Sequence, residues 1–193
     1  YGQAWERMML LKARPVAGDK GVGSDFLKMV RPFVFRRSLD YKFLGELKSI
    51  KGKIDRREEL KGDIKNVKLG YGGIREIEFI VQTMQILNYP AHPDVFHPTT
   101  LIGIEILKEK DFLEEETADT LTYGYNFLRR LEHMTQIEQE KQTHIVPEKS
   151  DTYPLYLERA GFDTNDDFQL KYKWVTGRVH DIFKSVIDDA EDG

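Results

Sequence analysis

Apolar residues recur every three to four positions along most of the chain, which is the spacing of an amphipathic helix. The clearest repeat follows a glycine-rich turn, and its apolar face consists of Ile77, Ile80, Val81, Met84 and Leu87. Comparable repeats predict helices over residues 3–14, 24–37, 41–60, 99–110, 114–141, 152–160 and 164–186. No segment shows a convincing strand pattern. The sequence therefore predicts an all-α fold, a multi-helix bundle.

Proline, glycine and capping residues set the expected helix boundaries. Pro15 ends the first helix, because a residue before proline is disfavoured in the α region. Ser24 is the expected N-cap of the second helix, which we expect to be kinked at Pro32. Residues 62–68 are expected to form a loop or a short strand, and Gly161 is expected to end the helix before it.

Two helices carry specific expectations about which residues share a side. The first is expected to place Trp5, Met8, Met9 and Lys12 along one side. The longest helix, over residues 114–141, is expected to direct five side chains into the core: Leu121, Tyr125, Leu128, Leu131 and Ile137.

Composition and charge narrow the class of protein. The chain has 193 residues and no cysteine, which excludes a disulfide framework and a cysteine-based zinc site. No apolar run is long enough for a membrane span, so a cytoplasmic protein is the expectation. Net charge is −4, but residues 1–75 carry 18 Lys and Arg against 9 Asp and Glu. This basic part could face phosphates or an acidic partner domain, whereas a dedicated nucleic-acid surface is disfavoured by the lack of interleaved exposed aromatics.

The glycine-rich turn before the central helix is the first candidate for chemistry. It reads Lys68-Leu69-Gly70-Tyr71-Gly72-Gly73, and the following helix would point free N–H groups at it, as in many anion sites. A polar stripe on the same helix contains Arg75, Glu78, Gln82 and Gln85. Two interpretations stay open. Arg75 either pairs with Glu78 or a carboxylate on a neighbouring helix, or joins the turn in binding an anion.

Other candidate sites are weaker. His92, Asp94 and His97 lack a well-spaced further ligand, so no metal site is predicted. His133 could act as a general base, but a lone helical histidine is more often a packing residue. Gly23-Ser24-Asp25 looks like the start of a nucleotidyltransferase metal motif, yet no Asp-x-Asp follows at a suitable distance.

Four sequence blocks, read together, resemble the bacterial glutamine synthetase adenylyltransferase family. They occur in order within residues 1–147. The blocks are Gly2-Gln3-Ala4-Trp5-Glu6-Arg7 with Lys12-Ala13-Arg14-Pro15-Val16-Ala17-Gly18-Asp19; Phe33-Val34-Phe35-Arg36-Arg37 with Leu39-Asp40; Lys68 to Phe79 with Val81-Gln82 and Gln85; and Phe127-Leu128-Arg129-Arg130-Leu131-Glu132-His133 with Gln142-Thr143-His144 and Pro147. Met134, Thr135 and Glu140 depart from the residues usual in the family.

The resemblance implies a place in a larger enzyme. Members contain two nucleotidyltransferase units, each followed by a helical domain; the amino-terminal unit removes AMP from glutamine synthetase by phosphorolysis, yielding ADP, and the other adds AMP from ATP. Arg75-Glu76-Ile77-Glu78 looks like the amino-terminal version. Residues 1–20 would be the trailing part of a nucleotidyltransferase domain, and residues 21–193 its helical companion. The start without methionine also indicates a fragment of a larger multidomain protein.

The resemblance also implies roles for single residues. Lys68, Gly70, Gly72, Gly73 and Arg75 would meet phosphate charge. The remaining residues would position or support them: Glu76 and Glu78 beside the turn or a partner arginine, Lys12 and Arg14 at an interdomain cleft, and Gln82, Glu132 and His133 as further supports.

The expected ligands and partners follow from the same resemblance. Magnesium and ATP or ADP belong to the full-length parent, whose metal-binding carboxylates would lie upstream, so this fragment alone is expected to bind neither and to be inactive. Glutamine synthetase, a PII signalling protein and the upstream domain are the expected partners, with no nucleic acid and no membrane. One alternative is a non-catalytic module that docks glutamine synthetase or PII. Another is the uridylyltransferase that modifies PII, which the Trp5-Glu6-Arg7 and Arg75 to Phe79 contexts disfavour.

Overall fold

The computed structural model describes residues 4–35, 45, 52 and 65–192, and its regular structure is helical. The elements are α1 (Ala4–Leu11), α2 (Lys20–Val34), α4 (Ile74–Asn88), the short 3-10 helix η1 (Pro93–Val95), α5 (Thr100–Glu109), α6 (Glu115–Gln139), α7 (Tyr153–Ala160) and α8 (Asn165–Asp192). Within these residues the extended structure is limited to a single antiparallel bridge between Asn66 and Ile145. The predicted all-α fold is confirmed. The helix predicted over residues 41–60 lies outside the described residues.

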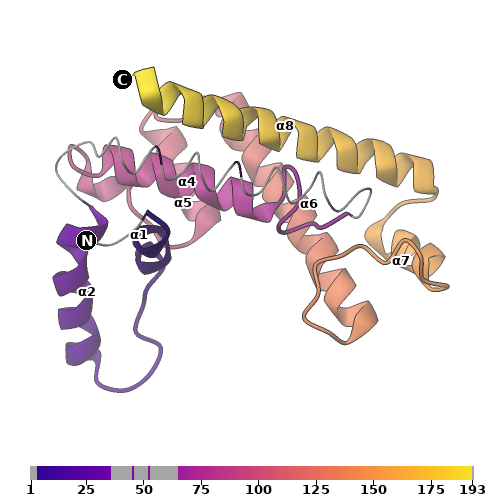
Figure 1. Cartoon of the computed structure of the whole chain (residues 1–193), viewed down its shortest axis with the longest axis horizontal. Coiled ribbons are helices and arrows are strands. Elements are labelled where there is room, and N and C mark those ends of the chain that lie inside the picture. Colours follow the sequence, from indigo (N-terminus) through magenta and orange to yellow (C-terminus); the bar gives the residue numbers. More distant parts are fainter. Residues whose placement is uncertain (1–3, 36–44, 46–51, 53–64, 193) are drawn as a thin grey trace.

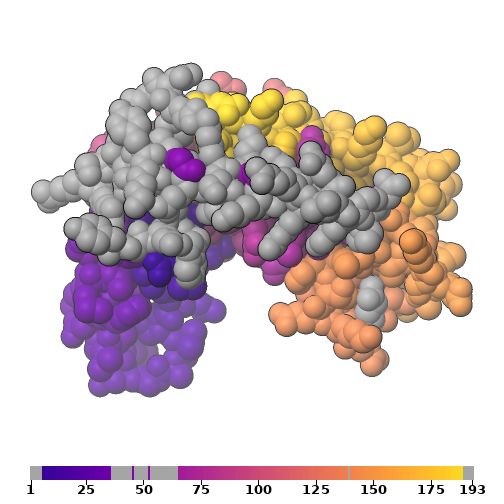
Figure 2. Space-filling model, viewed as in Figure 1, coloured from indigo at the N-terminus to yellow at the C-terminus, as the bar shows by residue number. Residues whose placement is uncertain are grey.

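Helix α4 is the centre of the arrangement. It packs against α8, α5, α6 and α1. In Figure 1, α8 runs alongside α4, α6 crosses beside it, and α1 with α2 lies at the opposite end from α7. Figure 2 shows that the surface is hollowed between the α1 and α2 side and the end of α6 with α7. The helix that the sequence marks most clearly therefore lies at the centre of the fold, whereas α2 packs on α1 and α7 packs on α6.

Two apolar clusters hold these helices together. The larger joins α4, α5, α6, α7 and α8 and includes fully buried Ile77, Leu121, Leu128 and Phe168. The smaller fixes α1 and α2 to the rest through Met8, Leu11, Val34, Phe35 and Ile86. Burial of side chains of this size contributes roughly 1.5–3 kcal/mol each. The core lies around α4, as its apolar face predicts.

The start of α2 differs from the prediction. The helix begins at Lys20, because Oδ1 of Asp19 accepts hydrogen bonds from the N–H groups of Gly21 at 2.6 Å and Val22 at 3.3 Å. An aspartate at this position satisfies first-turn donors that would otherwise lack partners. Ser24 is therefore inside the helix and is not its N-cap. Pro32 falls in the last turn, and the helix ends at Val34.

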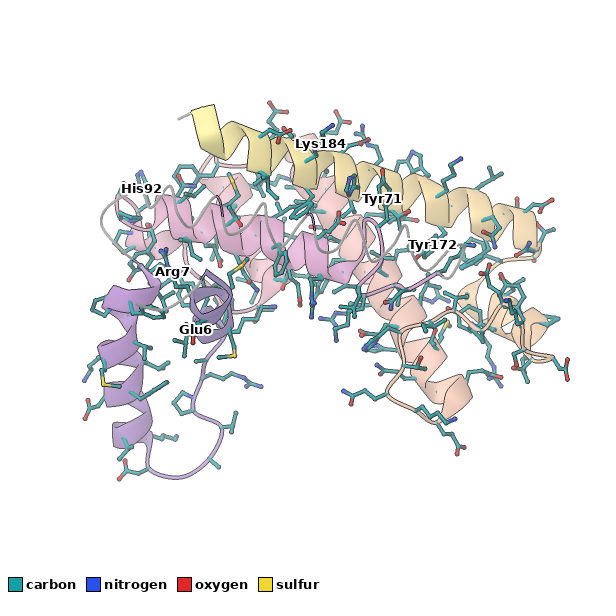
Figure 3. The ribbon with its side chains drawn as sticks, viewed as in Figure 1. Glu6, Arg7, Tyr71, His92, Tyr172 and Lys184 are labelled. Atoms are coloured by element: carbon teal, nitrogen blue, oxygen red, sulfur yellow. The ribbon has the colours of Figure 1, made fainter. Side chains whose placement is uncertain are left out.

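Ile137, which was expected in the core, is on the surface, and so is Met9, which was expected to share a side of α1 with buried Met8. Met9 is 59% exposed and Ile137 is 72% exposed. On α1 the buried side follows Met8 and Leu11, and Arg7 on that helix donates two hydrogen bonds to the carbonyl of Val34 (Figure 3). Ile137 lies near the end of α6, where α7 covers only the side that carries Thr135. Both expectations were wrong because a periodic pattern does not show which side a neighbouring helix covers.

Other boundaries agree more closely with the sequence. Gly161 ends α7 in the left-handed conformation at φ 84°. Helix α1 ends at Leu11, before Pro15. Helix α6 ends at Gln139, two residues earlier than predicted, and α8 extends to Asp192, beyond the predicted end at residue 186. None of the helices in the described ranges combines the length and apolar character that crossing a membrane requires.

Candidate functional site

The glycine-rich turn is built by one asparagine and its own backbone. Oδ1 of Asn66 accepts the N–H groups of Lys68 at 3.1 Å and Leu69 at 2.8 Å, and the carbonyl of Asn66 accepts the N–H of Gly70 at 2.9 Å. An asparagine that bonds the backbone two or three residues ahead stabilises a tight turn. The turn is therefore closed by local bonds and needs no ligand to hold its shape.

The N–H groups at the start of α4 are already bonded. Ile74 donates to the carbonyl of Val67 at 3.0 Å, and Arg75 donates to that of Lys68 at 3.0 Å. Glu76 and Ile77 donate to the carbonyl of Gly73 at 3.0 Å and 3.5 Å. The expectation that these donors are free for an anion is wrong, since the turn folds back over the helix end. An anion beside the turn therefore cannot be bound by the N–H groups of residues 74–77.

The turn also packs directly against α8. Gly72 has a φ of 62°, and a Cβ there would lie 1.8 Å from the carbonyl oxygen of Thr176. A Cβ on Gly73 would lie 2.8 Å from the carbonyl oxygen of Gly70. These two glycines therefore serve the close approach of backbone to backbone.

A histidine of α8 completes this side of the turn. The ring of Tyr71 stacks on His180 with 4.0 Å between centroids, and Figure 3 shows Tyr71 beside α8. Nδ1 of His180 lies 3.1 Å and 3.3 Å from the two carboxylate oxygens of Glu76, which is 1% exposed. Of the two partners that the resemblance implies for Glu76, the turn or an arginine, Glu76 thus lies beside the turn through His180.

On the other side of α4, five residues form what we call the charged cluster: Lys12, Lys68, Glu78, Arg129 and Glu132. Oε1 of Glu78 is 2.9 Å from Nζ of Lys12 and 3.0 Å from the guanidinium of Arg129. The same guanidinium donates to Oε2 of Glu132 at 2.6 Å. Nζ of Lys68 lies 3.3 Å from Oε1 of Glu132. Arg129 on α6 therefore joins residues far apart in the sequence into one network.

Burial and charge act together on this network. Burial lowers the pKa of Arg129, but its hydrogen bonds with Glu132 and Tyr125 outweigh burial and raise that pKa above its usual range. Burial raises the pKa of Glu132, but the hydrogen bond from Arg129 and the charges of Arg129 and Lys68 hold that pKa below its usual range. Both groups are therefore charged at neutral pH.

His144, in the segment after α6, borders the cluster at Glu132. Its Nδ1 lies 3.0 Å from Oε1 of Glu132, yet neither atom has a partner aligned for a hydrogen bond. Burial and the charge of Lys68 lower the pKa of His144, which keeps the ring neutral at pH 7. His144 therefore lies as a neutral ring against the Glu132 end of the charged cluster.

Positive charge exceeds negative charge in the charged cluster. Three cations face two carboxylates, and Arg75 lies one turn before Glu78 on α4. Arg75 is exposed and makes no ion pair or hydrogen bond through its side chain in the part of the chain that the structure describes. Glu78 is paired with Lys12 and Arg129, so the interpretation in which Arg75 pairs with Glu78 is wrong. An exposed cation beside a network with surplus positive charge can bind an anion.

The other predicted site residues are scattered. Gln82 is buried on α4, while Arg14 and His133 are exposed and lie outside the contacts of the cluster. Sequence reasoning missed Arg129, Tyr125 and His144 as site residues. Arg129 stands three residues before Glu132, a spacing that places two side chains on one helix face. That spacing was a usable signal, whereas the approach of His144 depends on tertiary structure.

A metal does not fit these residues. Across residues 4–35 and 65–192, no group of three or more His, Asp or Glu could hold a metal ion. The resemblance implies magnesium in the parent enzyme, and nothing in this donor set provides its ligands. The cluster instead has the donors that bind phosphate or carboxylate groups.

Comparison with models of protein families identifies the family of this domain. A family model described as GlnD PII-uridylyltransferase matches residues 48–187, which is more than half of the chain. The chain therefore belongs to this family.

Individual relatives then narrow the assignment. Bifunctional glutamine synthetase adenylyltransferase/adenylyl-removing enzymes match almost the whole chain. The enzyme of Methylococcus capsulatus is 40% identical over 185 residues, covering 95% of this chain and 19% of the relative. Those of Agrobacterium fabrum and Pseudomonas putida are 37% and 35% identical over 97% and 99% of this chain. The resemblance to glutamine synthetase adenylyltransferases is confirmed, and the chain spans about a fifth of these relatives' length.

Proposed function

We propose that this chain is the helical part of the adenylyl-removing site of a bifunctional glutamine synthetase adenylyltransferase. The surplus of positive charge around Glu78 and Glu132 is the observation that supports this role. Lys12, Lys68 and Arg129 face only two carboxylates, with Arg75 exposed beside them. Such a site suits the phosphate that attacks and the nucleotide that leaves.

The proposed reaction is a phosphorolysis. An oxygen of inorganic phosphate forms a bond to the phosphorus of an AMP group carried by a tyrosine. The bond from that phosphorus to the tyrosine oxygen breaks, the tyrosine leaves with its electron pair and takes up a proton, and ADP is the product. Both reactants carry negative charge, so catalysis depends on positioning and on electrostatic stabilisation.

The residues of this chain divide into two roles. Arg129 forms ion pairs with Glu78 and Glu132, and we assign it the role of positioning the side chains of the charged cluster. Lys68 and Arg75 lie at the two ends of the glycine-rich turn, where the N–H of Arg75 bonds the carbonyl of Lys68. We assign these two to phosphate binding, with Lys12 adding charge from the end of α1. Magnesium, when bound by carboxylates of another domain, would neutralise further phosphate charge.

Arg75 offers the sharpest test of this assignment. In a longer protein that contains the nucleotidyltransferase domain, Arg75→Ala is expected to raise the KM for phosphate in adenylyl removal about tenfold, the effect of losing a charge-assisted hydrogen bond. The melting temperature should stay nearly unchanged, because the side chain is exposed and has no ion pair among the described residues. Lys173→Ala, which removes an exposed cation from α8, is the matched control. An unchanged KM in the Arg75 variant would remove Arg75 from the site.

A second candidate function is a docking module for glutamine synthetase or a PII protein. The supporting observation is an exposed aromatic surface on α6 and α8, where Tyr123, Leu170 and Trp174 are 44%, 69% and 51% exposed. Nζ of Lys171 lies over the rings of Tyr123 and Trp174 at 4.5 Å and 4.9 Å. Aromatic residues with a cation are enriched in protein interfaces. Binding of a protein partner without any thermal shift from ADP, ATP or phosphate would favour this function.

A further inference from the structure

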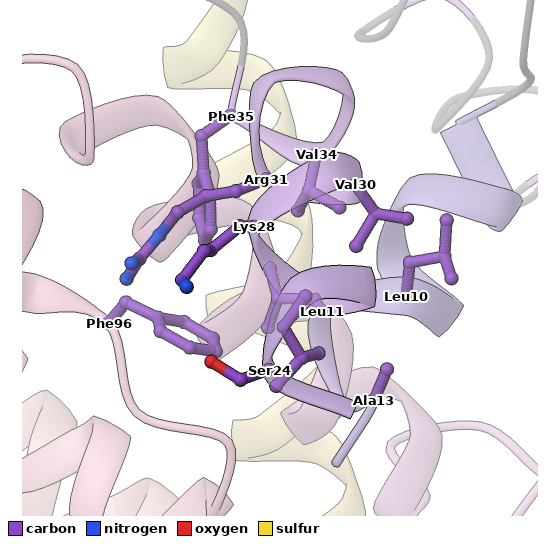
Figure 4. A pocket seen from close by; sticks show the side chains of 11 residues that line it. Leu10, Leu11, Ala13, Ser24, Lys28, Val30, Arg31, Val34, Phe35 and Phe96 are labelled. Atoms are coloured by element: carbon purple, nitrogen blue, oxygen red, sulfur yellow. The ribbon is translucent and has the colours of Figure 1, made fainter. Parts of the chain in front are cut away.

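A separate pocket lies between α1 and α2 (Figure 4). Its volume is about 300 Å³, and it shares no lining residue with the charged cluster. The lining is mostly aliphatic and aromatic and includes Leu11, Leu27 and Val30, while its polar members are Ser24, Lys28 and Arg31. A volume at the lower end of the usual ligand-pocket range suits a small molecule.

The two ends of this pocket differ in polarity. Figure 4 shows the side chains of Lys28 and Arg31 extending toward Phe96, with the hydroxyl of Ser24 beside that ring. Leu10 and Val30 lie at the other end. Ser24, Lys28 and Arg31 are spaced by four and three residues, which places them along one side of α2. The pocket thus joins a polar end with donors to an apolar end.

The charges at the polar end have one sign. None of the lining residues is acidic. Lys28 pairs with Asp25 at 3.1 Å, but both side chains are more than two thirds exposed. Another anion can therefore readily replace the Asp25 carboxylate as the partner of Lys28. The Arg31 guanidinium stacks 5.6 Å from the centre of the Tyr89 ring and pairs with no carboxylate in the described part of the chain.

The polar end is also held in place before any ligand arrives. Tyr89, which supports Arg31, stacks on Phe35 with 3.6 Å between centroids. Phe35 in turn meets Phe96 edge to face at 5.2 Å. An arginine fixed over an aromatic ring loses less conformational entropy when it binds an anion.

We propose that this pocket binds a small amphipathic anion. Its carboxylate or phosphate head would contact Ser24, Lys28 and Arg31, and its compact apolar part would lie against Leu10, Leu11 and Val30. The site is independent of the proposed phosphate site at the charged cluster. A ligand here would contact the junction between α1, α2 and the end of α4.

Octanoate is a suitable probe, and octyl phosphate tests the other head group. Both would be titrated below their critical micelle concentrations into the 193-residue chain with labelled leucine and valine methyl groups. Saturable shifts are expected at the methyl groups of Leu11, Leu27 and Val30. The tighter of the two probes identifies the preferred head group. Octyltrimethylammonium, which has the same tail and the opposite charge, should bind at least about tenfold more weakly.

Two variants separate the head contact from the apolar contact. Arg31→Gln is expected to raise the Kd of octanoate about tenfold, because it removes a charge-assisted hydrogen bond. Leu27→Trp is expected to fill the pocket and abolish the shifts. Lys173→Gln, at an exposed cation on α8, is the matched control and should leave the Kd unchanged. Equal binding of the cationic and anionic probes, or an unchanged Kd in Arg31→Gln, would overturn the proposal.

Discussion

Replacing Gly72 by alanine is expected to lower the free energy of unfolding by about 2 to 5 kcal/mol. Two effects add at this position. The φ of 62° is a left-handed conformation that costs an L-residue energy, and the new Cβ would lie 1.8 Å from the carbonyl oxygen of Thr176. That oxygen belongs to the backbone of α8 and cannot turn aside as a flexible side chain can. The turn or the helix has to move.

Gly18→Ala is the matched control for this substitution. Gly18 also has a positive φ, at 82°, but a Cβ there would meet nothing within 4 Å. Its expected cost is about 1–2 kcal/mol, from backbone conformation alone. Guanidinium unfolding of the two variants measures the difference. Equal losses would show that Gly72 is not needed for the contact with α8.

Replacing Arg129 by methionine is expected to destabilise the protein by about 3 kcal/mol. Methionine retains most of the apolar part of the arginine side chain. The carboxylates of Glu78 and Glu132, however, lose the guanidinium that both of them contact. Glu132 is only 2% exposed, so its charge would remain buried with Lys68 as its nearest cation. Removing one member of a buried ion pair costs more than the pair itself contributes, because the remaining charge is left poorly solvated.

Two further variants test whether the unpaired, buried charge of Glu132 causes this loss of stability. Adding Glu132→Gln to Arg129→Met should restore part of the stability, because it removes the buried charge. Arg130→Met, at the exposed neighbouring position where the side chain donates to the carbonyl of Arg159 at 3.2 Å, should cost about 0.5 kcal/mol or less. Chemical unfolding of these variants and of Glu132→Gln alone gives the values that the comparison needs. An additive double variant would contradict the account of the charged cluster.

The sequence was sufficient for the fold class and for the central helix. The apolar spacing over residues 74–88 was enough to predict the helix and the burial of Ile77, Ile80 and Val81, but Gln82 and Gln85 of the predicted polar stripe are also buried. Helix boundaries were harder, because several residues compete to cap the same turn. Asp19 and Ser24 can both cap a helix, and only the positions of the surrounding residues decide between them.

The candidate site was predictable only in part. Lys68, Glu78 and Glu132 were proposed from the resemblance, and the structure brings them into one network. Glu76 was grouped with Glu78, although two helical positions differ by about 200° and place the two carboxylates on opposite sides of α4. The pairing of Arg129 with Glu78 joins residues 51 positions apart. No local pattern encodes such a contact, and the same holds for His144.

The most direct test of the central claim is phosphate-dependent release of ADP from adenylylated glutamine synthetase. The assay compares the 193-residue chain with a longer protein that includes the nucleotidyltransferase domain. We expect release by the longer protein only, because this chain offers cations for phosphate but no metal-binding group among its described residues. Transfer of AMP from ATP by the longer protein, without release of ADP, would contradict the assignment to the adenylyl-removing site.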